Sequence, residues 1–187
     1  MTAFEFLSVA LSFVLGLAVT LVLTSLLAAF RARHESRLDW LPFVWAGYVL
    51  VYQFQYWWAI FELSVLPEWT PASFGILLLL AAILFLAGGL TLPTGARDYP
   101  ADLSQYFRTD GRWGVAALAA YGVIGTAGNV VMFGVPILSP LSGVTAGTVG
   151  AALIVVSSEE RWVQIAGTLV FGGFLIVAVA LATPGSY

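Results

Sequence analysis

The sequence predicts an all-α integral membrane protein: a six-transmembrane-helix bundle with short loops and with both termini on the outer side. Two observations predict this fold. Hydrophobic residues make up 60% of the chain and charged residues only 9%, which lies well outside the composition of soluble domains. In addition, the seven basic residues fall in polar stretches that alternating helices would place on one side of a membrane. We expect a single transmembrane domain over residues 1–187.

Six apolar stretches predict the membrane spans. A helix needs about 20 apolar residues to cross the hydrocarbon core. The expected spans are residues 4–30, 42–63, 71–92, 113–133, 140–156 and 159–182. Two of the starts are marked locally, since Thr70 and Ser139 each stand directly before a proline, as an N-cap residue before the first helical position does.

The arginines predict the orientation of the bundle. The odd-numbered loops, residues 31–41, 93–112 and 157–161, carry all of them, and the even-numbered loops carry none. Under the positive-inside rule these loops are cytoplasmic, which predicts an integral protein of the plasma (inner) membrane.

A helical pattern is present within the third of these loops. Tyr99, Leu103 and Tyr106 recur at helical spacing among polar residues. This pattern is typical of a short amphipathic helix lying on the inner leaflet, and Gly111 is the expected end of that helix.

A polar face runs along the second predicted span and is the main candidate for a functional site. Its residues follow steps of four and three: Tyr48, Tyr52, Gln55, Ala59 and Glu62. At about 1.5 Å per residue the face extends for about 21 Å. Two interpretations stay open. In the first, a water-filled path is lined by Tyr48, Tyr52, Gln55 and Glu62. In the second, the polar groups form hydrogen bonds to neighbouring helices, each worth on the order of 1 kcal/mol. Gln53 lies on another face, where a packing bond is expected.

Small residues form ridges on several spans and predict close helix packing. On the first span the ridge is Ser8, Ser12, Gly16, Thr20 and Thr24, and on the fifth it is Gly143, Gly147 and Gly150. On the fourth span Gly122, Gly125 and Asn129 share a face. A hydroxyl-lined pore wall is the alternative interpretation of the first ridge, whose hydroxyls would otherwise bond carbonyls of their own helix.

Three carboxylates are expected on the outer side without a cation nearby: Glu5, Glu62 and Glu68. Such an acidic rim would concentrate cations at the mouth of a path. The alternative is that these side chains are simply solvated at helix ends.

The composition excludes several classes of function. Cysteine and lysine are absent and histidine occurs once, as His34, in a polar loop. Disulfides, thiolate nucleophiles, a retinal Schiff base and bis-histidine haem ligation are therefore excluded. No enzyme activity, no cofactor and no metal site are expected, and no basic patch supports nucleic-acid binding.

The function expected from these features is a small channel or transport subunit, cation-conducting and working as an oligomer. Its expected partners are membrane lipids and either further copies of the chain or another membrane protein. Two alternatives stay open: a non-catalytic assembly subunit of a larger membrane complex, and a lipid-binding membrane protein.

Overall fold

The computed structural model describes residues 3–65, 69–95 and 99–182. Within these residues the chain is helical and forms no sheet. The long helices are α1 (Ala3–Ala32), α2 (Trp40–Glu62), α3 (Pro71–Thr91), α5 (Arg112–Phe133), α6 (Pro140–Ser157) and α7 (Arg161–Ala182). Three short segments complete the order: η1 (Leu63–Val65), α4 (Leu103–Tyr106) and the π-helix η2 (Phe107–Gly111).

The long helices occupy the six predicted spans, with ends that differ by about two residues at most. Both predicted proline-linked caps are present. The Thr70 hydroxyl accepts a hydrogen bond from the Ser73 amide at 3.1 Å, and the Ser139 hydroxyl accepts one from the Ser142 amide at 3.2 Å. These caps satisfy amides that the first turn of a helix leaves unpaired.

Five of these helices are long and apolar enough to cross a membrane, namely α1, α3, α6, α7 and the continuous stretch from α4 through α5. Their outward faces carry large apolar side chains, such as Phe13 (70% exposed) and Val131 (74% exposed). Such a surface is suited to lipid rather than water. α2 is long enough but not apolar enough, because Gln53, Gln55 and several tyrosine and tryptophan residues lower its hydropathy.

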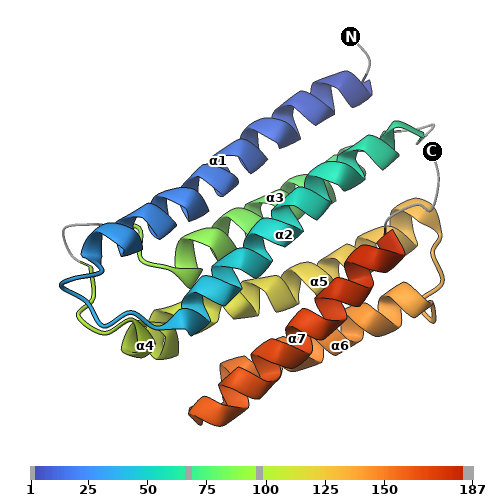
Figure 1. The fold of residues 1–187 in the computed structure, drawn as a ribbon. Helices are drawn as coiled ribbons and strands as arrows, with labels where there is room; N and C mark the ends of the chain where they lie inside the picture. Colours follow the sequence, from blue (N-terminus) through green and yellow to red (C-terminus); the bar gives the residue numbers. More distant parts are fainter. Residues whose placement is uncertain (1–2, 66–68, 96–98, 183–187) are drawn as a thin grey trace.

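Successive long helices run in opposite directions along the bundle (Figure 1). The described arginines consequently gather at one end, which we call the arginine end: Arg31, Arg33, Arg37, Arg108, Arg112 and Arg161. The beginning of α1 and the end of α7 lie at the other end, which we call the opposite end.

At the arginine end the first and third polar loops are hydrogen-bonded to each other. The Arg37 amide donates to the Ala101 carbonyl at 2.8 Å, and the Leu103 amide donates to the Arg37 carbonyl at 3.1 Å. The Ser36 hydroxyl adds a bond of 2.6 Å to the Pro100 carbonyl. Segments about 64 residues apart are thereby fixed side by side.

The prediction that Gly111 ends an amphipathic helix is wrong. α4 passes through the π-turn of η2 directly into α5, so Gly111 lies inside a continuous helical stretch. The segment is also more deeply packed than a surface helix, since Leu103 and Phe107 are completely buried. The Tyr106 hydroxyl donates to the Leu90 carbonyl at 3.0 Å, which ties the segment to the end of α3.

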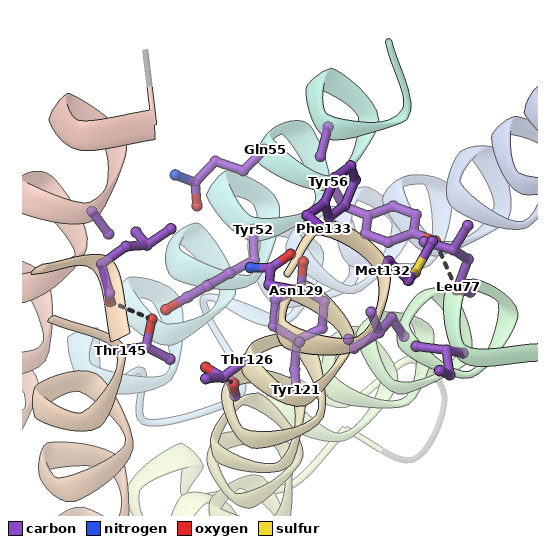
Figure 2. Close-up of a pocket in the computed structure, with 18 of the residues that line it drawn as sticks. Tyr52, Gln55, Tyr56, Leu77, Tyr121, Thr126, Asn129, Met132, Phe133 and Thr145 are labelled. Atoms are coloured by element: carbon purple, nitrogen blue, oxygen red, sulfur yellow. Dashed lines mark hydrogen bonds between the residues drawn. The ribbon is translucent and has the colours of Figure 1, made fainter. Parts of the chain in front are cut away.

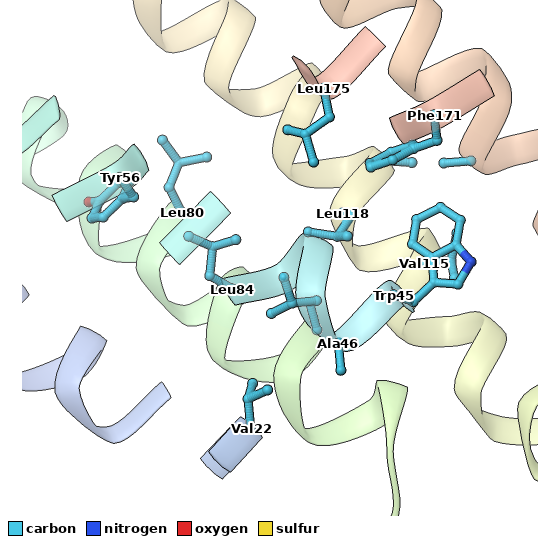
Figure 3. Packing of buried hydrophobic residues seen from close by; sticks show 14 of the residues in the cluster. Val22, Trp45, Ala46, Tyr56, Leu80, Leu84, Val115, Leu118, Phe171 and Leu175 are labelled. Atoms are coloured by element: carbon cyan, nitrogen blue, oxygen red, sulfur yellow. The ribbon is translucent and has the colours of Figure 1, made fainter. Parts of the chain in front are cut away.

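α3 lies at the centre of the bundle and contacts α1, α2 and α5. Its buried leucines and alanines, among them Ala81 and Leu84, belong to a core that extends from Val22 on α1 to Leu175 on α7 (Figure 3). α3 and α5 come close together at Gly114. A Cβ atom there would stand 2.9 Å from the Thr91 amide nitrogen, so only glycine permits this crossing.

Candidate functional site

A cavity of about 220 Å³ lies between α2, α3, α5 and α6, with Ala178 of α7 at its side (Figure 2). Most of its wall is apolar, including Ile60, Leu80 and Met132. Its polar side chains are hydroxyls and amides: Tyr52, Gln55, Tyr56, Tyr121, Thr126, Asn129, Thr145 and Thr148. A largely apolar pocket with a few hydrogen-bonding groups is the usual composition of a small-molecule site.

The cavity opens toward the opposite end of the bundle. Its exposed lining residues, Ala59, Asn129 and Phe133, belong to the last turns of α2 and α5. Tyr56 and Thr148, which also line it, are buried. From Ala59 to Tyr52 the cavity follows α2 for about 10 Å at ~1.5 Å per residue.

Toward the arginine end a packed aromatic cluster closes the cavity. The Trp45 ring is completely buried, and its centroid lies 4.6 Å from that of Phe171 on α7. The Trp45 indole donates to the Thr168 hydroxyl at 3.0 Å, and the Tyr48 hydroxyl donates to the Thr168 carbonyl at 3.1 Å. These bonds join α2 to α7 between the cavity and the arginine end.

Hydrogen bonds and ring contacts also hold the cavity wall. The Tyr56 hydroxyl donates to the Leu77 carbonyl at 2.7 Å, which fixes α2 to α3 (Figure 2). The Tyr121 ring packs edge-on against Tyr52, with centroids 5.4 Å apart, and against Tyr56 at 6.5 Å. The three phenol rings therefore form one connected wall between α2 and α5.

No charged side chain lines the cavity among the residues that the structure describes. An ion entering such a space would lose its hydration shell without a countercharge, which is costly. The hydroxyls and amides would instead serve a neutral molecule with its own donors and acceptors. The arrangement therefore suits a small uncharged ligand.

The four residues predicted to line a path do not all lie at the cavity. Tyr52 and Gln55 line the cavity. Tyr48 lies between the cavity and the arginine end, within the aromatic cluster. Glu62 is the last residue of α2, and its side chain is outside the described part of the chain. Gln53 is completely buried, and its amide donates to the Leu84 carbonyl at 3.3 Å, as a packing bond would.

The other two residues of the predicted acidic rim are placed differently. Glu5 is exposed in the first turn of α1, at the opposite end of the bundle. Glu68 lies outside the described residues. Neither is among the residues that line the cavity.

The predicted packing ridges face several directions. On α1, Gly16, Thr20 and Thr24 are exposed and Ser8 and Ser12 are half-buried. Ser8, Thr20 and Thr24 donate to carbonyls of their own helix. On α6, Gly147 packs against Phe174 of α7, whereas no side chain approaches the Gly143 and Gly150 positions within 4 Å.

For α5, the sequence predicted only that three residues share one helix face, and it did not predict a cavity there. Gly122, Gly125 and Asn129 of that face all line the cavity. Tyr121, Thr145 and Thr148 carried no separate signal, because single hydroxyls are common in membrane helices, where they bond to their own carbonyls. Thr145 and Thr148 do form such bonds, to Leu141 and Thr145.

The sequence matches no protein-family model, no curated protein and no solved structure in the comparisons made.

Proposed function

We propose that this protein is a membrane transport subunit whose cavity holds a small uncharged solute. The observation that carries the proposal is a cavity with uncharged hydrogen-bonding groups, whose exposed lining residues lie toward one end of the bundle and which has a packed aromatic cluster on its other side. A channel held open would need a continuous path. A cavity closed at one end instead fits alternating access, in which a solute is bound first from one side and then released to the other.

The packing of the helices supports a two-part mechanism. α1, α2 and α3 contact one another, and α6 contacts both α5 and α7. α3 and α5 join the two groups extensively, whereas α2 and α7 contact each other over a small area. In this proposal the α3–α5 contact acts as the hinge, and the α2–α7 contact at Trp45 and Thr168 opens to release the solute.

The proposed setting is the plasma membrane, with α2 as the sixth span. The hydrogen bonds of α2 within the bundle support this, because they pair the Gln53 amide nitrogen and the Tyr48 and Tyr56 hydroxyls with carbonyls of neighbouring helices. The arginine end would face the cytoplasm under the positive-inside rule, and the cavity would then open outward.

The proposed solute differs from the cation expected from the sequence. The uncharged lining favours a neutral molecule, while the carboxylate of Glu5 is exposed outside the cavity. An acidic group at the outer surface would influence the local potential without binding the solute.

Flux through the purified protein in liposomes tests this proposal. Glycerol and urea are the neutral probes, and their flux is measured by light scattering. Potassium is the ionic probe. Gln55→Leu should lower neutral-solute flux at least severalfold, because it removes an amide from the cavity wall. Phe54→Leu changes the exposed neighbour and serves as the control. Potassium flux exceeding neutral-solute flux would contradict the proposal.

The second candidate function is that of an assembly subunit. The open positions at Gly16, Gly143 and Gly150 favour it, because small residues at an outward face allow another helix to approach closely. An exposed groove of about 750 Å³ between α5 and α6 contains Gly143 and Gly150. Purification from native membranes in mild detergent tests this function. A partner lost on Gly143→Ile would support it, and a chain that purifies alone would count against it.

A further inference from the structure

A second, polar pocket lies at the arginine end, separate from the cavity. It has a volume of about 410 Å³ and lies between η2, the start of α5 and the segment that joins α6 to α7. Arg108 and Arg112 form one side, and Ser158, Glu159 and Gln164 form the other. None of these residues lines the cavity described above.

The two arginines of this pocket are available for a ligand. Among the described residues, no carboxylate lies within ion-pair distance of Arg108 or Arg112. Arg112 is half-buried, and its Nε atom is buried without a hydrogen-bond partner. A buried guanidinium nitrogen that lacks an acceptor carries a desolvation cost, which a bound anion would remove.

Gln164 supplies a second, independent indication of a ligand. Its side chain is only 3% exposed, and its Nε2 atom donates to the Ser158 carbonyl at 2.9 Å. Its Oε1 atom is buried without a partner. The pocket therefore combines unpaired donors on one side with an unpaired acceptor on the other.

The backbone places the two arginines together. Arg108 lies in the π-turn of η2 and Arg112 follows four residues later, at the start of α5. Single π-turns within helices frequently occur at functional sites, because the wider turn redirects side chains. A neighbouring pocket shares Arg108 and adds Arg37, while its Arg161 is already paired with Asp39.

We propose that this pocket binds a phosphate group that carries or adjoins a hydroxyl. The guanidinium groups of Arg108 and Arg112 would donate to the phosphate oxygens, in the manner typical of arginine. The hydroxyl would donate to the Oε1 atom of Gln164. The exposed rings of Trp113 and Trp162, beside Arg112 and Arg161, are typical of residues at the level of lipid headgroups. Phosphatidylglycerol and a free phosphate both offer this chemistry.

Titration calorimetry on the full chain in neutral detergent tests the pocket. One arm uses dihexanoyl phosphatidylglycerol and the other uses inorganic phosphate. Arg108→Gln and Arg112→Gln should each weaken binding about tenfold, since each removes charge-assisted hydrogen bonds. Arg31→Gln is the matched control: it removes the same charge at the same end from an exposed residue outside both polar pockets.

One further variant separates loss of binding from loss of folding. Glu159→Gln removes a negative charge from the pocket wall and should tighten binding severalfold, a gain that misfolding would not produce. Binding of the lipid alone would assign the phosphate to a headgroup, and binding of inorganic phosphate as well would assign it to a free ligand. The proposal is overturned if wild-type protein binds neither ligand, or if Arg31→Gln weakens binding as much as Arg108→Gln.

Discussion

The carboxylate of Asp39 accepts hydrogen bonds from both terminal nitrogens of the Arg161 guanidinium, at 2.5 and 2.7 Å. Asp39 also caps α2, because the same carboxylate accepts from the Leu41 amide at 3.2 Å. One buried acid therefore fixes the start of α2 and joins it to the start of α7. Arg161, which in the sequence indicated only the orientation, therefore has a structural role as well.

Arg161→Gln should destabilise the protein by about 1–2 kcal/mol, because the carboxylate of Asp39 loses a two-point partner while only 8% exposed. Partial exposure of Arg161, at 31%, keeps the expected loss below that of a fully buried pair. Thermal unfolding in detergent measures the effect. In a double-mutant cycle with Asp39→Asn the two losses should not add, and strict additivity would show that the pair contributes nothing.

Gly172→Ala should destabilise the α2–α7 contact by about 1–3 kcal/mol through overpacking. A Cβ atom at this position would overlap the hydroxyl of Tyr48 and would stand 3.1 Å from its Cζ atom. Gly173→Ala is the matched control, because no atom lies within 4 Å of the Cβ it would add. Tyr48→Phe should restore part of the loss, as measured by thermal unfolding. Equal effects at both glycines would mean that the ring does not pack as described.

We predict a loss of stability at alkaline pH as Tyr99 ionises. Burial raises the pKa of Tyr99 to about 12, and Tyr106 adds to the shift. The unfolded phenol ionises near pH 10, so the neutral folded form contributes stability that is fully present below about pH 10. This contribution should disappear between about pH 10 and 12, and Tyr99→Phe should flatten the profile in that range. An unchanged profile in the variant would assign the alkaline loss to other groups.

Much of the fold could be predicted because long apolar runs and proline-linked caps are local signals. The starts of α3 and α6, which are capped by Thr70 and Ser139, illustrate this. The path of the chain after Asp102 could not be predicted, because Gly111 is a typical helix end and only tertiary packing of Phe107 makes it part of a continuous helix. Local sequence does not encode that packing.

The site was predictable only in part, for a related reason. Helical spacing identified the face that carries Tyr52 and Gln55, but periodicity within one helix does not show which helix it will meet. Tyr48 shares the face and yet lies in the aromatic cluster, because Thr168 and Phe171 of α7 meet α2 at that level. The uncharged character of the cavity likewise depends on α5 and α6 meeting α2.

Cysteine labelling tests the proposed orientation, and the absence of native cysteine makes each introduced thiol unique. Asn129→Cys, near the mouth of the cavity, should react with a membrane-impermeant maleimide in intact cells. His34→Cys, in the exposed first loop at the arginine end, should react only after lysis. The reversed pattern would place the arginine end outside and overturn the orientation.

The most direct test of the central claim is neutral-solute flux after the cavity has been filled from within. Gly125 lines the cavity, and the nearest atom to an added Cβ, in Leu80, stands 4.0 Å away, so a valine would extend into free space. Gly173→Val places the same side chain on the exposed face of α7 as the control. We expect glycerol and urea flux in liposomes to fall at least tenfold in Gly125→Val and to stay at the wild-type level in Gly173→Val. Equal flux in the two variants would contradict transport through this cavity.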